Sequence, residues 1–323
     1  MREKISLVDL FCGAGGFAKG FYDLGFNIVL AIDNFKPASE TYKANFPEAI
    51  VITEDIRDVS CDFILKILGG REVDVVIGSP PCEPFTGANP RRKEKPLDRL
   101  YSDPMGQLTL EFIRIVKCLK PRIFVMENVP QILDNGLKHA LRREFRNAGY
   151  SNVFFNILRA EDYGTPSHRV RVFISNIKIK PKKTVKKYVT VEEALKDLPE
   201  PGSPEVPNHE PVPLSPRKLR RIAKVKWGQA LIRYEGFKGK LLPNLIRLHP
   251  KKLAPTVLGS SRFIHPFEDR FLTVREQARL MGYPDNFIFL GGRDAQFNQV
   301  GESVPVPLSK AIASVVLEEL MED

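Results

Sequence analysis

Short apolar runs alternate with stretches of helical periodicity through the first 178 residues of the chain. The runs are rich in β-branched and aromatic residues, as buried strands of a parallel sheet are, and comprise Ile5–Phe11, Asn27–Ile32, Ala49–Thr53, Val73–Ile77, Ile123–Met126, Asn152–Leu158 and Val170–Asn176. The helical patterns between them are Phe17–Leu24, Pro37–Asn45, Phe63–Leu68, Met105–Leu119 and Leu137–Ala148. This alternation predicts an α/β fold, a doubly wound sheet with helices on both faces. No clear helix separates the last two runs, so we expect the sheet to end in an antiparallel pair.

The size and charge of the chain limit what it can be. It has 323 residues, 43% of them hydrophobic, enough for two domains or for one large domain with an insertion. The net charge is +10 and the sequence pI is about 9.4, which favours a polyanionic partner. No apolar run reaches the roughly 18 residues of a membrane span, and no signal-peptide pattern opens the chain. We therefore expect a cytoplasmic protein without membrane contact.

Cysteine spacing bears on metal binding and on redox compartment. The four cysteines, Cys12, Cys61, Cys82 and Cys118, form no Cys-x-x-Cys pair. We expect neither a metal site nor a disulfide framework, which fits a reducing cytoplasm.

A glycine-rich turn follows the first predicted strand. Gly13 and Gly15 come just after Phe11 and let backbone amides approach a ligand at the start of a helix. Asp33 ends the second strand twenty residues beyond Gly13, a spacing that suits a carboxylate bound to ribose hydroxyls. Asp55 ends the third strand, where it can meet an adenine amine. Together these residues predict an adenosine-bearing cofactor.

Two classes of cofactor stay open at this point. Gly13, Gly15 and Ala18 satisfy the loose dinucleotide fingerprint, so NAD is the alternative. Asp9, inside the first strand, instead suits a cofactor without a pyrophosphate. A carboxylate there repels phosphate and can hold a positively charged amino-acid tail.

A thiol and a carboxylate follow two further strands. Val73–Ile77 leads into Gly78-Ser79-Pro80-Pro81-Cys82, where the two prolines fix two φ angles and hold Cys82 on a stiff turn. Glu127 directly follows Ile123–Met126. Because open α/β sheets place their chemistry at the carboxyl ends of strands, the pair predicts covalent catalysis by Cys82 with Glu127 as the acid partner.

The composition changes after residue 177. Residues 178–187 form a basic linker, residues 199–216 are rich in proline, and residues 217–227 have the pattern of a short basic helix. From Thr273 the chain is helical again, and Pro307–Met321 has the pattern of a terminal amphipathic helix.

Motifs along nearly the whole chain resemble those of the DNA (cytosine-5) methyltransferase family, in the family's order. They are Asp9–Phe17, Pro80–Cys82, Glu127–Val129, Ser167–Arg171, Arg270–Asp285 and Gln299–Pro305. Three positions depart from the family pattern: Glu83 and Ser167 each replace a glutamine, and Glu302 replaces an asparagine. None of these changes removes a group that the reaction needs, but Glu83 adds negative charge beside Cys82.

The resemblance implies a Rossmann-like class I methyltransferase sheet and a role for each matching residue. Cys82 is then the nucleophile, Glu127 binds the target base at N3, Arg171 holds its O2, and Arg169 braces the acid and the nucleophile. The implied cofactor is S-adenosyl-L-methionine. Its implied contacts are Asp9, Phe11, Gly13, Gly15, Gly16, Asp33, Asn34, Asp55, Ile56, Ser79, Pro81, Leu108, Glu302, Ser303 and Val304.

The resemblance also implies that the chain is divided into two domains. Residues 1–178 and 296–323 form the catalytic domain, and residues 179–295 form a smaller target-recognition domain. Double-stranded DNA is the expected partner and a cognate restriction endonuclease a further candidate, with the protein itself a monomer associated with the prokaryotic nucleoid. Residues 83–103 form a basic loop that we interpret as a lid closing on DNA. The expected DNA contacts are Arg91, Arg92, Lys93, Arg220, Arg221, Arg247 and Arg262.

Three other functions compete with DNA methylation. One branch of the same family methylates tRNA with the same motifs. An NAD oxidoreductase has no use for Pro-Pro-Cys or Glu-Asn-Val. A catalytically inactive DNA-binding module conflicts with the intact Cys82, Glu127 and Arg171.

Overall fold

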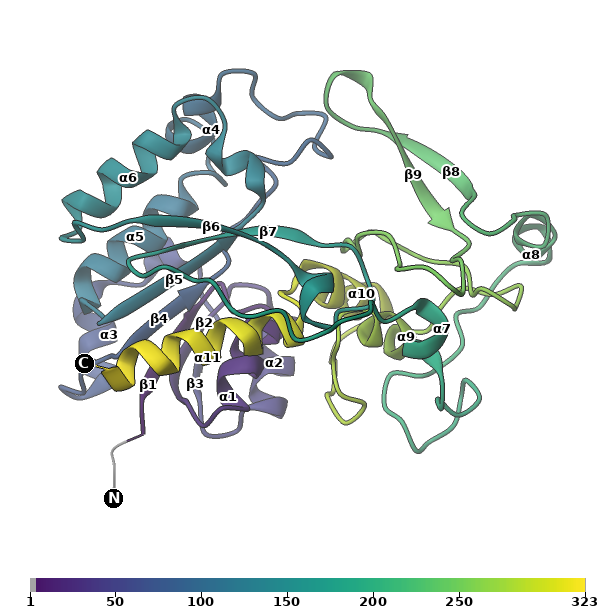
Figure 1. Cartoon of the computed structure of the whole chain (residues 1–323), viewed down its shortest axis with the longest axis horizontal. Coiled ribbons are helices and arrows are strands. Elements are labelled where there is room, and N and C mark those ends of the chain that lie inside the picture. The colour runs from purple at the N-terminus through teal and green to yellow at the C-terminus, as the bar shows by residue number, and fades with distance from the viewer. Residues whose placement is uncertain (1–3, 323) are drawn as a thin grey trace.

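A central seven-stranded sheet organises the protein, in a computed structural model that describes residues 4–322 (Figure 1). Its order is β3-β2-β1-β4-β5-β7-β6. The strands are β1 (Ser6–Leu10), β2 (Asn27–Ile32), β3 (Ile50–Ile52), β4 (Val75–Gly78), β5 (Ile123–Asn128), β6 (Phe154–Arg159) and β7 (Val170–Ser175). Strands β1 to β5 run parallel, whereas β7 pairs antiparallel with both β5 and β6. The predicted α/β sheet and its antiparallel end are confirmed.

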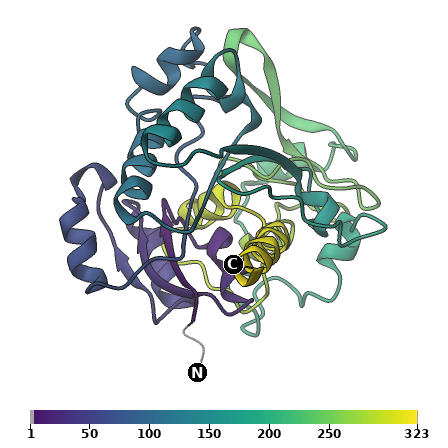
Figure 2. The same ribbon diagram turned by 60° about the vertical axis from the view of Figure 1, so that its left-hand side comes forward.

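Helices cover both faces because successive strand residues point to opposite sides. Leu7, Val75 and Val125 face one core, whereas Val8 and Val76 face the other. The first core is covered by α1 (Gly16–Tyr22), α2 (Lys36–Asn45) and α11 (Val306–Glu322). The second is covered by α3 (Cys61–Leu68), α5 (Leu108–Leu119) and α6 (Leu137–Asn147). Figure 2 shows α11 nearly end-on, on the side of the sheet away from α3.

The last helix returns to the start of the chain. A Cβ atom at Gly20 of α1 would lie 2.2 Å from the backbone nitrogen of Lys310, so the contact between α1 and α11 needs a glycine there.

Within residues 4–322 no single helix is long and apolar enough to cross a membrane. The bent pair of α10 (Arg293–Glu302) and α11 passes such a test by length and composition only.

The segment between β7 and α10 carries a small core of its own. Ile222, Val225, Leu245, Ile264 and Phe271 form that cluster. The segment contains α7 (Val191–Leu195), α8 (Pro216–Ile222), the β8–β9 hairpin (Ala230–Glu235 and Leu241–Ile246) and α9 (Val274–Arg279). The basic helix predicted over residues 217–227 ends earlier, at Ile222, and the hairpin was not predicted.

The main core reaches into both ends of this segment. Ile179, Val191, Val274 and Phe289 belong to the large cluster shared with α1 and α11. The assignment of residues 179–295 to a separate domain therefore stays a prediction.

Short helices complete the fold: α4 (Pro96–Tyr101) lies in the expected lid, and 3₁₀ turns span Ile56–Asp58, Pro130–Leu133, Ala160–Tyr163 and Phe237–Gly239.

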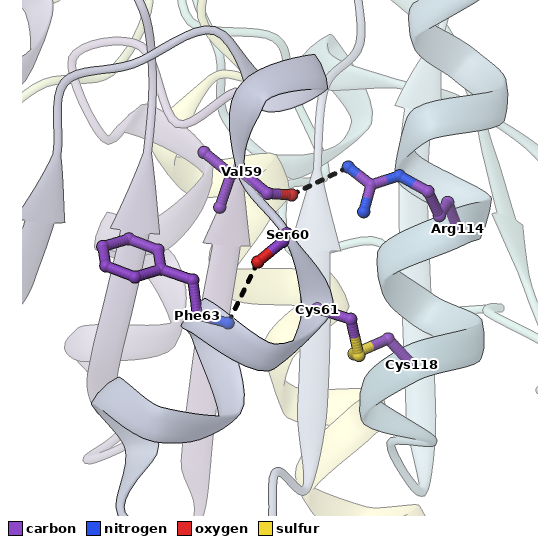
Figure 3. Close-up of a disulfide and its surroundings, with 6 residues drawn as sticks. All are labelled: Val59, Ser60, Cys61, Phe63, Arg114 and Cys118. Atoms are coloured by element: carbon purple, nitrogen blue, oxygen red, sulfur yellow. Dashed lines mark hydrogen bonds between the residues drawn. A yellow bond between two sulfur atoms is a disulfide. The ribbon is translucent and has the colours of Figure 1, made fainter.

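A disulfide joins Cys61 of α3 to Cys118 of α5, across 57 residues of sequence (Figure 3). The expectation that the cysteines form no disulfide framework is therefore wrong for these two. Linear spacing conceals the pair, because α3 and α5 pack side by side on one face of the sheet. Arg114 of α5 joins the same region to the chain before α3 by donating to the carbonyls of Ile56 (2.8 Å) and Val59 (3.0 Å).

Replacing both cysteines by alanine should destabilise the oxidised protein by about 4 kcal/mol, since a cross-link across a loop of this length restricts the unfolded chain. Urea unfolding followed by circular dichroism measures the difference. Adding dithiothreitol is the matched control, because it should bring the parent protein to the stability of the Cys61→Ala/Cys118→Ala variant. Equal stability of both proteins under oxidising conditions would contradict the bridge.

Candidate active site

The carboxyl ends of β1, β4 and β5 bring the predicted site residues to one edge of the sheet. Leu10 pairs with Gly78 and Gly78 with Met126, so β1 and β4 end level while β5 continues two residues further, to Asn128. The backbone nitrogen of Ser79 continues the ladder by donating to the carbonyl of Leu10 at 3.2 Å. The glycine turn, the thiol and the carboxylate therefore emerge beside one another.

The turn that carries Cys82 is fixed from both sides. The carbonyl of Cys82 accepts hydrogen bonds from the backbone nitrogens of Phe85 (2.9 Å) and Thr86 (3.0 Å). Before the cysteine, the side-chain amide of Asn128 donates to the carbonyl of Pro80 at 3.0 Å. Phe85 is completely buried and anchors the turn. Sequence reasoning did not single out Asn128, although it lies inside the Glu-Asn-Val motif.

The predicted acid, Glu127, forms a buried ion pair with Arg171. The Nε of Arg171 lies 2.8 Å from the Oε1 of Glu127, and both side chains are almost completely buried. Arg171 lies on β7 two residues from Phe173, the residue paired with Glu127, so both side chains project from the same face. The antiparallel strand therefore delivers a cation directly to the carboxylate.

Arg169 acts as a brace between separate segments. Its buried Nη1 donates to the carbonyls of Val257 (2.8 Å) and Gly301 (3.0 Å). Burial, together with the nearby positive charge of Arg171, lowers the pKa of Arg169 to about 9. These hydrogen bonds join Arg169 to Val257 and Gly301, so the expected role of bracing the acid and the nucleophile stays a prediction.

Burial dominates the ionisation of the Cys82 thiol and raises its pKa to about 11. Arg171 and Arg169 lower this pKa, whereas the carboxylates of Glu83 and Glu127 raise it. The protein without DNA therefore holds a mostly protonated thiol at neutral pH. Cys82 is half-buried and Cys12, the other free cysteine among residues 4–322, is buried.

Glu83→Gln should lower the pKa of Cys82 by removing a nearby negative charge. Since charges about 4 Å apart interact by about 1 kcal/mol in water, alkylation by iodoacetamide at pH 9 should accelerate up to about fivefold. Mass spectrometry locates the modified cysteine. Glu318→Gln, an exposed change in α11, is the matched control and should leave the rate unchanged. A slower reaction of Glu83→Gln would mean that Glu83 promotes ionisation instead.

A pocket beside this turn is lined by residues expected to bind an adenosine-bearing cofactor. Seven of the predicted cofactor contacts line it, namely Phe11, Asp33, Asn34, Asp55, Ile56, Pro81 and Leu108. Asp33 accepts hydrogen bonds from the backbone nitrogens of Gly13 (2.8 Å) and Phe35 (2.8 Å), which fix its carboxylate at the pocket wall. The residues present therefore supply both the carboxylates and the apolar walls that such a group needs.

The glycines of the turn have different structural roles. Gly13 has a φ of +51° and nothing within 4 Å of where a Cβ would lie, so its backbone faces open space. A Cβ at Gly15 would lie 2.4 Å from the ring of Phe46, and one at Gly16 would lie 2.7 Å from the carbonyl of Val304. Gly15 and Gly16 are therefore required for packing, and Gly13 alone leaves room for a ligand.

Asp9 does not face the pocket. It is completely buried, accepts a hydrogen bond from the Tyr42 hydroxyl at 3.1 Å, and has its pKa raised by burial. The prediction that Asp9 holds a charged cofactor tail does not fit this position, because the strand points its side chain toward α2. Tyr42, for which the sequence offered no signal, is its partner.

The remaining predicted contacts lie close to the turn but outside the pocket lining. Ser79 is half-buried after β4, and Ser303 and Val304 follow α10. Desolvation raises the pKa of Glu302 to about 7, and the carboxylates of Glu83 and Asp33 add to the effect. The side chain of Glu302 still reaches solvent, which weakens this rise in its pKa.

Three of the seven expected DNA contacts are exposed, and two more are half-buried and form hydrogen bonds inside the protein. Arg91, Arg220 and Arg221 are exposed. Arg92 donates to the carbonyl of Phe85 at 2.8 Å, and Lys93 donates to the carbonyl of Ser102 at 2.8 Å.

The other two are held by the protein. Arg262 bonds to Asp294 at 2.8 Å and stacks 4.1 Å from the centre of the Phe297 ring. Arg247 is buried and donates to the carbonyls of Ile222, Val225, His265 and Glu268 and to Asp269. The expectation that Arg247 contacts DNA, for example by reading a base, is wrong, because its guanidinium is fully engaged inside the protein.

Arg247→Met should destabilise the protein by about 3 kcal/mol or more, because it leaves several buried carbonyls and Asp269 without a donor. Thermal unfolding measures the loss. Arg220→Met is the matched control, an exposed position where stability should change little. A stable Arg247→Met protein that methylates a different sequence would restore the base-reading role.

A family model for C-5 cytosine-specific DNA methylases matches residues 5–318. The chain belongs to this family. M.MJ0563P of Methanocaldococcus jannaschii, assigned as a type II methyltransferase, is 55% identical over 98% of this chain and 100% of its own length. Type II methyltransferase M1.HphI of Haemophilus parahaemolyticus is 36% identical over 98% of this chain and 87% of its own length. The resemblance inferred from the motifs is confirmed, and the protein is a cytosine-5 DNA methyltransferase.

Solved structures share the fold. A protein assigned as an Escherichia coli prophage DNA modification methyltransferase has a TM-score of 0.79 and 24% identity, over 99% of this chain and 100% of that one. Dnmt2 methyltransferase of S. pombe has a TM-score of 0.69 and 19% identity, over 98% and 99%. The Rossmann-like fold expected from the sequence is confirmed.

Proposed function

We propose that this methyltransferase transfers a methyl group from S-adenosyl-L-methionine to C5 of a flipped-out cytosine in duplex DNA, through a covalent bond between Cys82 and C6. The observation that carries the proposal is the convergence of Cys82, Glu127 and Arg171 at one sheet edge, beside the pocket lined by Asp33 and Asp55.

Cys82 supplies the nucleophile. The C5 position of cytosine is unreactive until the thiolate adds to C6 and turns the ring into an enamine. The raised pKa of Cys82 means that ionisation must be promoted when the base arrives. Arg171 and Arg169 are the cations that favour it.

Glu127 and Arg171 hold the base. Glu127 favours protonation at N3 as negative charge develops there. Arg171 uses Nε for Glu127 and Nη1 for the carbonyl of Val170 (2.9 Å), and no hydrogen bond within residues 4–322 occupies its Nη2. That nitrogen is available for O2 of the cytosine. Loss of the C5 proton to water then expels Cys82.

The cofactor supplies an electrophilic methyl group when bound. Asp33 and Asp55 hold its ribose and adenine, with Phe11, Ile56, Pro81 and Leu108 as apolar walls. Asn34, Ser79, Glu302, Ser303 and Val304 remain proposed contacts around the same pocket.

Double-stranded DNA is the proposed substrate, and its target base must leave the stack before Cys82 can reach it. The net charge of +10 and the exposed Arg91, Arg220 and Arg221 suit binding to phosphates. We further propose a monomer that works at the nucleoid in the cytoplasm. Relatives named as type II methyltransferases support a cognate restriction endonuclease as a candidate partner.

The parent protein should methylate cytosine in duplex DNA and trap a covalent adduct with a duplex that contains 5-fluorocytosine. Cys82→Ser should abolish both, because a hydroxyl is a far weaker nucleophile, while DNA affinity stays within about tenfold. Bisulfite sequencing reports the methylated base and its sequence, and gel electrophoresis reports the adduct. Cys12→Ser, the other free cysteine, is the control and should keep both activities.

Adduct formation by Cys82→Ser would assign the nucleophile to another residue. Methylation of tRNA but not of duplex DNA would favour the tRNA branch of the family instead.

A further inference from the structure

The tip of the β8–β9 hairpin touches the loop that follows the nucleophile, residues 83–103, as Figure 1 shows at the top of the molecule. The backbone nitrogen of Phe237 donates to the carbonyl of Gly87 at 3.0 Å. The Arg92 guanidinium lies 4.2 Å from the centre of the Phe237 ring, and Lys238 lies 3.4 Å from Glu94. A backbone bond, a cation–π contact and an ion pair therefore join two segments more than a hundred residues apart.

The contact depends on a glycine. A Cβ at Gly236 would lie 2.8 Å from the carbonyl of Gly87, which is closer than side chains pack. Gly236 itself is buried, whereas its neighbour Lys238 is exposed. The backbone of the hairpin tip, rather than a flexible side chain, therefore sets how closely the hairpin approaches the loop.

A short chain of contacts leads from this tip to the nucleophile. Phe237 holds the guanidinium of Arg92, whose Nη1 donates to the carbonyl of Phe85 at 2.8 Å. The backbone nitrogen of Phe85 donates in turn to the carbonyl of Cys82 at 2.9 Å. Phe85 is completely buried, so the residue that joins Arg92 to the turn is held in the core.

We propose that Phe237 is a positioning residue for methyl transfer: through Arg92 and the backbone of Phe85, it holds the turn that presents Cys82. The proposal rests on the proposed function, in which Cys82 is the nucleophile. Since the hairpin belongs to the region expected to recognise DNA, a hairpin displaced by the wrong sequence also displaces the nucleophile. Recognition is thereby coupled to the chemical step.

The experiment uses the full chain with saturating S-adenosyl-L-methionine and a 5-fluorocytosine duplex carrying the site mapped by bisulfite sequencing. Phe237→Ala should slow single-turnover adduct formation roughly 3- to 30-fold, the range of a partly desolvated cation–π contact. DNA affinity, measured separately by titration, should change less than about threefold, so that kcat falls and KM does not. Phe237→Tyr keeps the aromatic face and should restore the rate.

A double-mutant cycle tests whether Phe237 acts through Arg92. If both lie on one chain of contacts, Phe237→Ala combined with Arg92→Gln should be no slower than the slower single variant. Phe267→Ala is the matched control: Phe267 is an exposed aromatic residue of the same region that contacts Trp227 and His265 instead of the loop. Its adduct rate should equal that of the parent.

Two results would overturn the proposal. One is a parental adduct rate for Phe237→Ala with weakened DNA binding, which would make Phe237 a DNA contact only. The other is full additivity with Arg92→Gln. If Phe237→Ala does not fold, Phe237→Leu removes the π face while keeping an apolar side chain, and the same comparison applies. Failure of the parent protein to form any adduct would contradict the proposed function rather than this inference.

Discussion

The buried ion pair between Glu127 and Arg171 depends on the direction of a single strand. Glu127 is the next-to-last residue of β5, and Arg171 reaches it because β7 runs antiparallel beside β5. A buried charge is tolerated when it is paired, and removing either partner would leave the other uncompensated in the core. The same two residues act in opposite directions on the pKa of Cys82, the cation lowering it and the carboxylate raising it. Fold and reactivity are therefore joined at this contact.

The sequence predicted the elements whose signal is local. Apolar runs located the sheet strands, and turn chemistry located Gly13, Cys82 and Glu127 at strand ends, where the structure has them. The β8–β9 hairpin escaped prediction because its residues are mostly half-buried or exposed, and because Pro243 lies inside β9. Its pairing is defined by Gly236 and the neighbouring turn rather than by a buried face.

Contacts between segments far apart in the chain could not be predicted from the sequence either. Cys61 and Cys118 meet because two helices pack on one face of the sheet, which spacing alone does not reveal. Residue type also misled: Arg247 has the chemistry of a base-reading side chain, yet five groups inside the protein bind its guanidinium. Asp9 was placed correctly on its strand but was assigned to the cofactor, whereas its buried side chain accepts a hydrogen bond from Tyr42.

The active site is thus assembled from segments that fold under different constraints. The sheet edge that carries Glu127 is rigid, since both cores pack against it, whereas Cys82 lies on a turn whose position also depends on Asn128, Arg92 and Phe85. Arg169, just before β7, also links separate segments by donating hydrogen bonds to the carbonyls of Val257 and Gly301. A nucleophile whose position depends on several segments suits a reaction whose substrate must first be turned out of a duplex. The thiol can stay protonated until the base, the cations and the loop are together, and only then does attack on C6 become favourable.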